Sequence, residues 1–265
     1  MLDYRHCTLC PRACGVDRAA GERGFCQMPD HILAARAALH YWEEPVISGS
    51  FGSGAVFFSG CTLRCAFCQN GVISQENFGK EVSSQELRAA FERLIDEGCQ
   101  NINLVTPTHF LPSILPALTP KLPVPVVYNC GGYEAAEGLA IASGFTDIFL
   151  TDVKYHDNSL AQKYSGAANY RETSTDALRT MLKLAGKPAL DENGILKSGV
   201  IVRHLVLPSH RQDSIRLMQH LKSEFGTDAF ILSLMSQFTP NGALADFPEI
   251  NRRLTTFEYR SVTET

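Results

Sequence analysis

From about residue 54 onward, short apolar runs alternate with segments of helical periodicity. Each apolar run has the length of a strand and ends in polar or turn residues, which is typical of strands buried on both faces. The alternation therefore predicts a regular succession of strands and helices. The predicted strands are AVFFSG at 55–60, NINLVTP at 101–107, PVVYNC at 125–130, DIFLTDVK at 147–154, GVIVRHLVLP at 199–208 and AFILSLMSQFTP at 229–240.

The most clearly marked helix begins after Ser83. Ser83 and Glu86 have the spacing of a capping box, and Gly98 follows the helix as a C′ residue. The apolar residues between them recur every three or four positions, so they share one face. This face consists of Leu87, Phe91, Leu94 and Ile95, and further helices are predicted at 109–118, at 133–144, at 159–186 with a break near Ser165 and Gly166, at 211–226 and at 248–259.

Six strands that alternate with helices predict an α/β fold with a parallel sheet and right-handed crossovers. Functional groups of such folds gather at the C-terminal ends of the strands. Residues 1–30 lack this periodicity, so we divide the chain into a cysteine-rich extension, 1–45, and a larger part, 46–265. The polar residues at the predicted strand ends are Cys61, Thr106, Thr108, His109, Asn129, Asp152, Lys154, Arg203, His204 and Gln237.

Composition and charge exclude several classes of function. The 265 residues are 45% hydrophobic and 20% charged, with a formal net charge of −4 and scattered Lys and Arg, which argues against nucleic-acid binding. No apolar segment is long enough to span a bilayer, and the N-terminus MLDYRHCTLC lacks the apolar core of a signal peptide. We therefore expect a cytoplasmic protein without a membrane partner.

Cysteine is the unusual component of this sequence. There are nine cysteines, and seven of them fall into two tight groups. In a reducing compartment, clustered cysteines bind metal more often than they form disulfides. Cys99 and Cys130 stand apart, and we expect them to be small buried side chains.

The loop after the first predicted strand, GCTLRCAFCQN, has the spacing C-x3-C-x2-C at Cys61, Cys65 and Cys68. Three thiolates on a short loop can bind three irons of a [4Fe-4S] cubane and leave the fourth iron open. A zinc site is the alternative, but structural zinc usually takes four protein ligands in closely spaced pairs. The pattern therefore favours an iron–sulfur cluster with a free coordination position.

This loop resembles the signature of the radical S-adenosylmethionine (SAM) superfamily, in which an aromatic residue precedes the last cysteine, here Phe67. The resemblance implies that SAM binds the open iron and is cleaved to methionine and a 5′-deoxyadenosyl radical. It also implies a partial (β/α)6 TIM-like barrel, with the cysteine-rich extension as a small metal-binding appendage. Over nearly the whole chain, the sequence is similar to a PflX-like group related to pyruvate formate-lyase activating enzyme. The segments that carry this similarity are CTLCPRACGV, HYWEEPVISG, GSGAVFFSGCTLRCAFCQN, NLVTPTH, NCGGYE, TDVKY, VIVRHLVLP and LMSQFTP.

The resemblance also implies roles for single residues. Phe67 matches the aromatic residue near the adenine, and Asp152 and Lys154 match an Asp-x-Lys that faces the site and that we assign to catalysis. Arg203 matches a strand-end arginine that can fork onto the SAM carboxylate. The alternative is a purely structural role, in which Asp152 and Lys154 pair with each other and Arg203 pairs with a nearby acid. We assign Gly60 and Asn129 to the same cofactor pocket. Thr106, Thr108 and His109 stand where the superfamily usually has Gly-Gly-Glu, and we assign them to this pocket too. Glu43 and Glu44 could equally face solvent.

The N-terminal group has the spacing C-x2-C-x3-C-x11-C at Cys7, Cys10, Cys14 and Cys26. Four thiolates complete a closed site, so either an auxiliary [4Fe-4S] cluster or structural zinc is chemically sound. Three cysteines on one loop with a fourth returning from a distance favour the cluster, and disulfides come third.

Three functions follow as hypotheses. The first is hydrogen abstraction from a protein, as in relatives that install a glycyl radical. The second is radical modification of a peptide or a small metabolite. The third, from another class, is a non-catalytic iron–sulfur electron-transfer protein. For either enzyme, the resemblance implies flavodoxin or ferredoxin as the electron donor, and relatives often continue with further helical sequence beyond the point where this chain ends.

Overall fold

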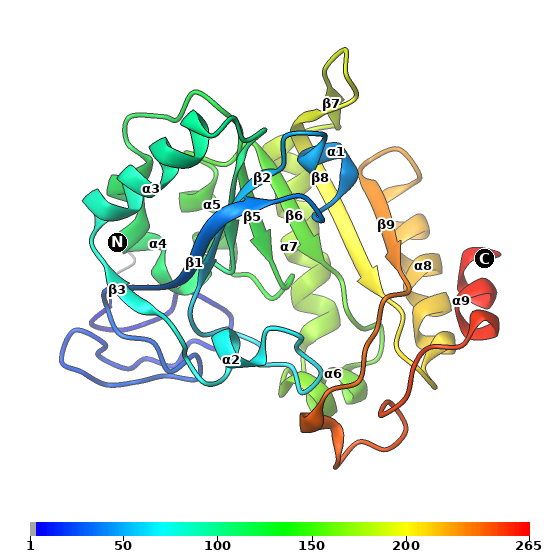
Figure 1. Ribbon diagram of the computed structural model, residues 1–265. Helices are drawn as coiled ribbons and strands as arrows, with labels where there is room; N and C mark the ends of the chain where they lie inside the picture. Colours follow the sequence, from blue (N-terminus) through cyan, green and yellow to red (C-terminus); the bar gives the residue numbers. More distant parts are fainter. Residues whose placement is uncertain (1–3) are drawn as a thin grey trace.

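A nine-stranded sheet forms the centre of the computed structural model, which describes residues 4–265. The strand order is β3-β1-β2-β4-β5-β6-β8-β7, and β9 also pairs with β8 (Figure 1). The strands are β1 (Ile32–His40), β2 (Ser53–Phe58), β3 (Lys80–Val82), β4 (Ile102–Val105), β5 (Val126–Cys130), β6 (Ile148–Asp152), β7 (Ala189–Leu190), β8 (Leu196–Leu205) and β9 (Ile231–Met235).

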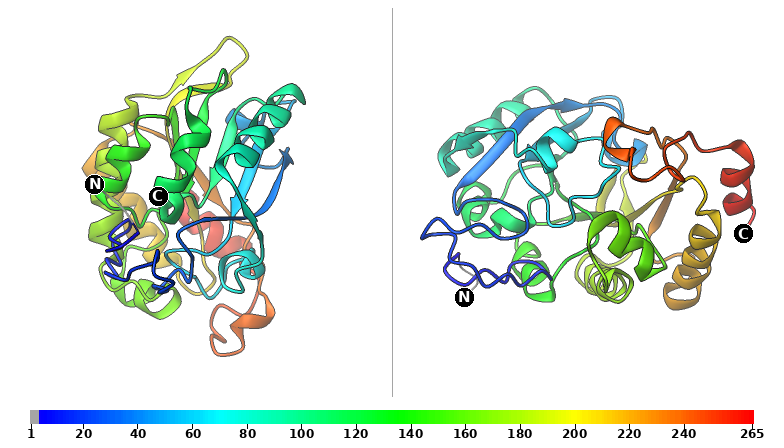
Figure 2. Two further views of the ribbon diagram at one scale, coloured as in Figure 1. Left: turned by 90° about the vertical axis from the view of Figure 1, so that its left-hand side faces the viewer. Right: turned by 90° about the horizontal axis from the view of Figure 1, so that it is seen from below.

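The six predicted strands are confirmed as β2, β4, β5, β6, β8 and β9. Each pairs in parallel with the next, so their C-terminal ends lie at one end of the molecule. The helices between them pack along the outer side of the curved sheet, as a partial (β/α)6 barrel requires (Figures 1 and 2). The cysteine-rich segment, α2 and α6 lie at the same end as the C-terminal strand ends (Figure 1).

Local sequence signals explain where the helices begin and end. The Ser83 hydroxyl accepts a hydrogen bond from the Glu86 N–H (3.2 Å), and the Glu86 carboxylate accepts one from the Ser83 N–H (2.8 Å), as the capping box predicts. Gly166 (φ +59°) ends α6 and separates it from α7, which confirms the predicted break. The helices are α1 (Pro45–Ser48), α2 (Gly71–Ser74), α3 (Ser84–Asp96), η1 (Thr108–Phe110), α4 (Leu111–Ile114), η2 (Leu115–Leu118), α5 (Ala136–Ala142), α6 (Asn158–Ser165), α7 (Tyr170–Ala185), α8 (Arg211–Phe225), η3 (Gly242–Leu244) and α9 (Thr256–Thr263).

Three apolar clusters hold these layers together. The largest lies between the sheet and its helices and contains Phe91 of α3, which is fully buried. Burial of such a side chain stabilises the fold by about 1.5–3 kcal/mol, so Phe91→Ala should weaken the packing of α3 on the sheet. A second cluster lies beneath the triad loop, and a third fills the barrel around Ile47, Val127 and Leu150.

The sequence did not reveal strand β1. It pairs antiparallel with β2 and with β3, so residues 32–40, which we had assigned to the extension, belong to the sheet. The division at residues 45 and 46 stays a prediction, whereas the segment 4–31 is built of turns. Within residues 4–265, no helix combines the length and the apolar character needed to cross a membrane.

Candidate metal centre

Cys61, Cys65 and Cys68 lie on the loop that follows β2, which we call the triad loop (residues 60–70). Gly60 opens the loop with a φ of +76°, and a Cβ there would lie 2.5 Å from the Met28 side chain, so only glycine fits. All nine cysteines of the chain carry free thiols. Each of the three triad sulfurs accepts a hydrogen bond, from the N–H of Leu63 to Cys61 (3.4 Å), from the hydroxyl of Ser165 to Cys65 (2.9 Å) and from the hydroxyl of Ser74 to Cys68 (3.3 Å).

The electrostatics of these thiols suit a bound cation. Burial, followed by the neighbouring Cys65, raises the pKa of Cys61 to about 12. Burial also raises the pKa of Cys65, against the opposing effect of the Lys154 ammonium. Buried thiolates are therefore unfavourable here unless a cation neutralises them, and three iron ions of a cubane would do so. The donor set fits the three-iron attachment that the sequence predicts.

The triad borders a cavity of about 160 Å³ at the C-terminal ends of the strands. Its lining residues come from the triad loop, from α2 and from the ends of β2, β4, β5, β6 and β8. The predicted residues among them are Gly60, Cys61, Cys65, Cys68, Thr106, Asn129, Asp152, Lys154 and Arg203. Residues far apart in the sequence therefore converge where parallel-sheet topology predicts a site.

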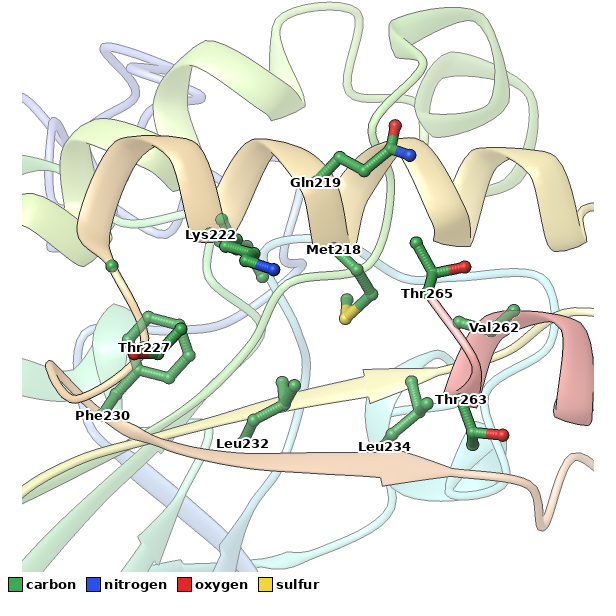
Figure 3. Close-up of a pocket in the computed structure, with 12 residues that line it drawn as sticks. Met218, Gln219, Lys222, Thr227, Phe230, Leu232, Leu234, Val262, Thr263 and Thr265 are labelled. Atoms are coloured by element: carbon green, nitrogen blue, oxygen red, sulfur yellow. The ribbon is translucent and has the colours of Figure 1, made fainter.

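A larger cavity lies elsewhere and lacks this chemistry. It measures about 590 Å³ and lies between α8, β9 and α9, with Met218, Leu232, Leu234 and Val262 around it (Figure 3). Its lining is largely apolar and contains no cysteine or histidine. We therefore place the candidate site in the smaller cavity beside the triad.

Opposite the triad, four charged side chains form a buried network. Asp152 accepts from the Lys154 ammonium (2.5 Å) and from Arg203 Nε (2.8 Å). Arg203 also donates to Glu43 (2.5 Å) and to the Asn129 side-chain oxygen (2.9 Å). Burial alone would raise the pKa of Asp152, but Arg203 and Lys154 outweigh it and hold the pKa at about 2. Asp152 is therefore a carboxylate that orients two cations.

Sequence reasoning left Glu43 open, and the structure buries it. Its side chain is only 9% exposed, and it accepts from Arg203 and from the Asn103 side chain (3.0 Å) inside the barrel. The turn between β1 and α1 brings Glu43 to this position, and the sequence did not predict that turn because it did not predict β1. Two carboxylates thus face two cations in the network, which keeps its charge balanced.

The predicted segment after β4 divides between the cavity and the wall behind it. Thr106 lines the cavity and has a φ of +60°, an unusual backbone conformation for a β-branched residue. Thr108 and His109 are buried and are not part of the cavity lining. Thr108 binds Glu134 (3.0 Å), a residue that we had not selected and whose pKa burial raises to about 7, and His109 binds the Ser59 carbonyl (2.7 Å).

Phe67 packs behind the triad loop. Its ring contacts those of Tyr155, Tyr164 and Phe238 edge-on or tilted, with centroids 6.1–6.3 Å apart. It is buried in this aromatic cluster and does not border the cavity. The contact with adenine that the resemblance implies stays a prediction.

The N-terminal cysteines lie in the turns of segment 4–31. Cys7, Cys10 and Cys26 are buried and Cys14 is exposed. Arg12 links this segment to the triad loop, because it donates to the carbonyls of Thr62 (2.9 Å) and Ser165 (2.8 Å). In the part of the chain that the structure describes, no three His, Cys, Asp or Glu side chains are arranged around a single metal ion.

Comparison with known proteins places the chain in a family. It is 31% identical over 271 residues, 98% of this chain and 74% of its relative, to the uncharacterized protein MJ0674 of Methanocaldococcus jannaschii. The chain belongs to the family of this protein. Residues 48–110, which include the triad loop, match a family described as a 4Fe-4S single cluster domain.

Solved structures share the fold at low sequence identity. The SAM-bound structure of Streptococcus suis SuiB has a TM-score of 0.55 and 11% identity over 77% of this chain. The radical SAM methyltransferase TsrM from Kitasatospora setae, with tryptophan and a SAM analogue bound, has a TM-score of 0.51 and 13% identity over 76% of it. This chain spans 44% of the SuiB chain and 38% of the TsrM chain. The chain therefore shares the partial-barrel fold of these two proteins.

Proposed function

We propose that this protein is a radical SAM enzyme that binds a [4Fe-4S] cluster on Cys61, Cys65 and Cys68. The observation that carries the proposal is that these thiols and the charged strand-end residues line one cavity. The matched 4Fe-4S family and the shared fold support it. A cluster with SAM on its open iron supplies a 5′-deoxyadenosyl radical when it is reduced.

The network assigns different tasks to Lys154 and Arg203. Arg203 uses three of its five N–H groups, one from each guanidinium nitrogen, on Asp152, Glu43 and Asn129, and these three bonds fix the orientation of the guanidinium. Lys154 has three N–H donors and uses one of them on Asp152, so two remain for a ligand in the cavity. We therefore propose that Lys154 binds the SAM carboxylate, that Arg203 holds Asp152, and that Asp152 orients Lys154.

For the substrate, we propose hydrogen abstraction from a protein, including activation of a glycyl radical enzyme. The similarity to the PflX-like group motivates this choice. Radical modification of a peptide is the second candidate, because a SuiB structure of the same fold contains its precursor peptide SuiA (TM-score 0.53, 11% identity). A small metabolite stays within that second candidate.

Other partners follow from the chemistry. A low-potential donor, flavodoxin or ferredoxin, would supply the electron in an oxygen-poor cytoplasm. Cys7, Cys10, Cys14 and Cys26 are candidates for a second metal site, an auxiliary [4Fe-4S] cluster or zinc.

Anaerobic reconstitution followed by incubation with SAM and dithionite tests the proposal. We expect 5′-deoxyadenosine, and a glycyl EPR signal when a cognate glycyl radical enzyme is added. Isotope transfer from a peptide or metabolite into 5′-deoxyadenosine would instead support the second candidate. A loaded cluster without SAM cleavage, with and without candidate substrates, would leave a non-catalytic electron-transfer protein.

A further inference from the structure

The turns of segment 4–31 gather the four N-terminal cysteines. The backbone of Cys7 pairs with Gly15 (3.0 Å) and Val16 (3.1 Å), directly after Cys14. The Cys14 sulfur in turn accepts a hydrogen bond from the N–H of Phe25 (3.4 Å), directly before Cys26. The two ends of the segment are thereby held against Cys14.

Glycine is required at the closest point of this arrangement. A side chain at Gly24 would place its Cβ 2.9 Å from the Cys14 sulfur and 3.1 Å from the Cys14 Cβ. Backbone approach this close to a cysteine sulfur is typical of chain wrapped tightly around a thiol-bound centre. Three of the four thiols are buried in this wrapping, and Cys14 alone reaches the surface.

Arg18 is a buried cation inside the same segment. It is 1% exposed, and its guanidinium donates to the carbonyls of Met28 (3.0 Å), Pro29 and His109 (2.7 Å). Its Nη1 also lies 3.8 Å from the Cys7 sulfur. Among residues 4–265, no carboxylate pairs with it; besides the carbonyls, its guanidinium lies 4.4 Å from the centre of the Tyr4 ring. Neutral partners leave its charge uncompensated, and a buried charge without a counter-charge is unfavourable. The nearby thiols are the groups that could supply the missing negative charge.

We propose that Cys7, Cys10, Cys14 and Cys26 bind a second [4Fe-4S] cluster, and that Arg18 is the buried cation that compensates its thiolates and tunes its reduction potential. Four thiolates occupy every iron, so this site is closed to SAM and substrate, unlike the triad. This cluster goes beyond the proposed function, which leaves a cluster or zinc open at these cysteines, and it does not depend on SAM chemistry at the triad.

The first experiment separates the two sites by mutation. The triple variant Cys61→Ala/Cys65→Ala/Cys68→Ala retains only the N-terminal group, and Cys10→Ala/Cys26→Ala retains only the triad. After anaerobic reconstitution, iron, sulfide and zinc are measured per chain, with circular dichroism as the check on folding. We expect about four irons and four sulfides in the triple variant, with little zinc.

Either site can fail without the other. One zinc per chain in the triple variant, or a folded chain without metal, would overturn the second cluster, even if the reciprocal variant holds iron. Iron in the triple variant but none in the reciprocal one would instead overturn the proposed function. If the triple variant does not fold, the wild type decides, because about eight irons support the second cluster and about four irons with one zinc contradict it.

The second experiment tests Arg18 through the potential of the cluster. Net charge near a cluster is one of the factors that set its potential, so Arg18→Met should make the potential of the N-terminal cluster more negative. Arg18→Lys should restore most of the shift, and Arg23→Met, a matched change at an exposed arginine of the same segment, should leave the potential unchanged. Equal potentials in all variants, or loss of the cluster in both Arg18 variants, would overturn the charge role and leave a purely steric one.

Discussion

The two cysteine regions differ in what occupies the fourth position around their thiols. In the N-terminal segment a fourth cysteine closes the set, and a buried arginine lies beside it. At the triad, the fourth side faces a cavity bordered by Asn129, Asp152, Lys154 and Arg203. An open position can exchange ligands and a closed one cannot, so we propose that the triad carries the chemistry and that the N-terminal group supports the fold or stores an electron.

The largest expected effect comes from removing a triad ligand. Cys65→Ala should reduce 5′-deoxyadenosine formation to background, because in the proposed function its thiolate is one of the three ligands of the SAM-binding cluster. Cys10→Ala should leave measurable SAM cleavage, and Cys99→Ala, at a buried cysteine outside both groups, should match the wild type. Product formation under dithionite is followed by chromatography. Full activity of Cys65→Ala would contradict the assignment of SAM cleavage to the triad.

The next effect concerns the cation that faces the open position. Lys154→Met should weaken SAM binding about thirtyfold or more, since the loss of a buried hydrogen-bonded charge costs about 2 kcal/mol at least. Isothermal titration of the reconstituted, unreduced protein measures this. Lys121→Met is the matched control, because Lys121 forms an exposed pair with Asp147 (2.7 Å). An unchanged affinity for SAM in Lys154→Met would indicate that Arg203, and not Lys154, binds the SAM carboxylate.

Strand periodicity and the cysteine spacing sufficed to predict the six parallel strands and the two thiol groups. Alternation along the chain is a local signal, whereas the burial of Glu43 depends on β1, whose residues carry no clear period. The sequence also did not predict that the side chains of Thr108 and His109 lie behind the cavity, because their direction depends on a short 3-10 turn. The burial and hydrogen bonds of Glu134 could not be predicted, because its partner Thr108 is distant in the sequence and its partner Tyr128 lies on another element.

Loss of the missed acid should affect stability more than that of a surface acid. Glu43→Ala leaves Arg203 Nη1 and the Asn103 side-chain amide without their acceptor, and it removes one of the two carboxylates that balance the buried cations, so we expect the free energy of unfolding of the apoprotein to fall by about 3 kcal/mol. Glu92→Ala, at an exposed i,i+4 pair with Arg88 (2.8 Å), should cost about 0.5 kcal/mol. Urea denaturation of both variants measures the difference. Equal losses would show that Glu43 does not support the network.

The buried His109 should make the stability of the protein depend on pH. Burial, and then the nearby Arg18, lowers its pKa from 6.5 to about 3, so the folded chain keeps it neutral while the unfolded chain protonates it below about pH 6.5. Stability is therefore present above that pH and is lost as the pH falls toward 3. Between pH 7.5 and 5.5 the loss is about 1.4 kcal/mol.

His109→Gln should remove this part of the pH dependence. Urea denaturation of the wild-type and variant apoproteins at the two pH values gives the difference directly, and the exposed His6→Gln serves as the control. A wild-type minus His109→Gln difference that does not change between pH 7.5 and 5.5 would contradict a neutral buried imidazole.

The smallest expected effect concerns a single hydrogen bond to a triad sulfur. The Ser165 hydroxyl donates to the Cys65 sulfur (2.9 Å), and a hydrogen bond to a ligand sulfur favours the reduced, more negative cluster. Ser165→Ala should therefore lower the potential of the triad cluster by tens of millivolts, on a scale where about 59 mV is tenfold for one electron. EPR-monitored redox titration in the Cys10→Ala/Cys26→Ala background isolates that cluster, and Ser143→Ala, at a partly exposed serine whose hydroxyl donates to the Ala140 carbonyl, is the control. In the triad-less background, Ser165→Ala should leave the N-terminal cluster unchanged, because the only sulfur that the hydroxyl reaches among the described residues belongs to the open site. A shift at both clusters would mean that the two regions share one electrostatic environment and that the division between an open and a closed site is less sharp than their geometry indicates.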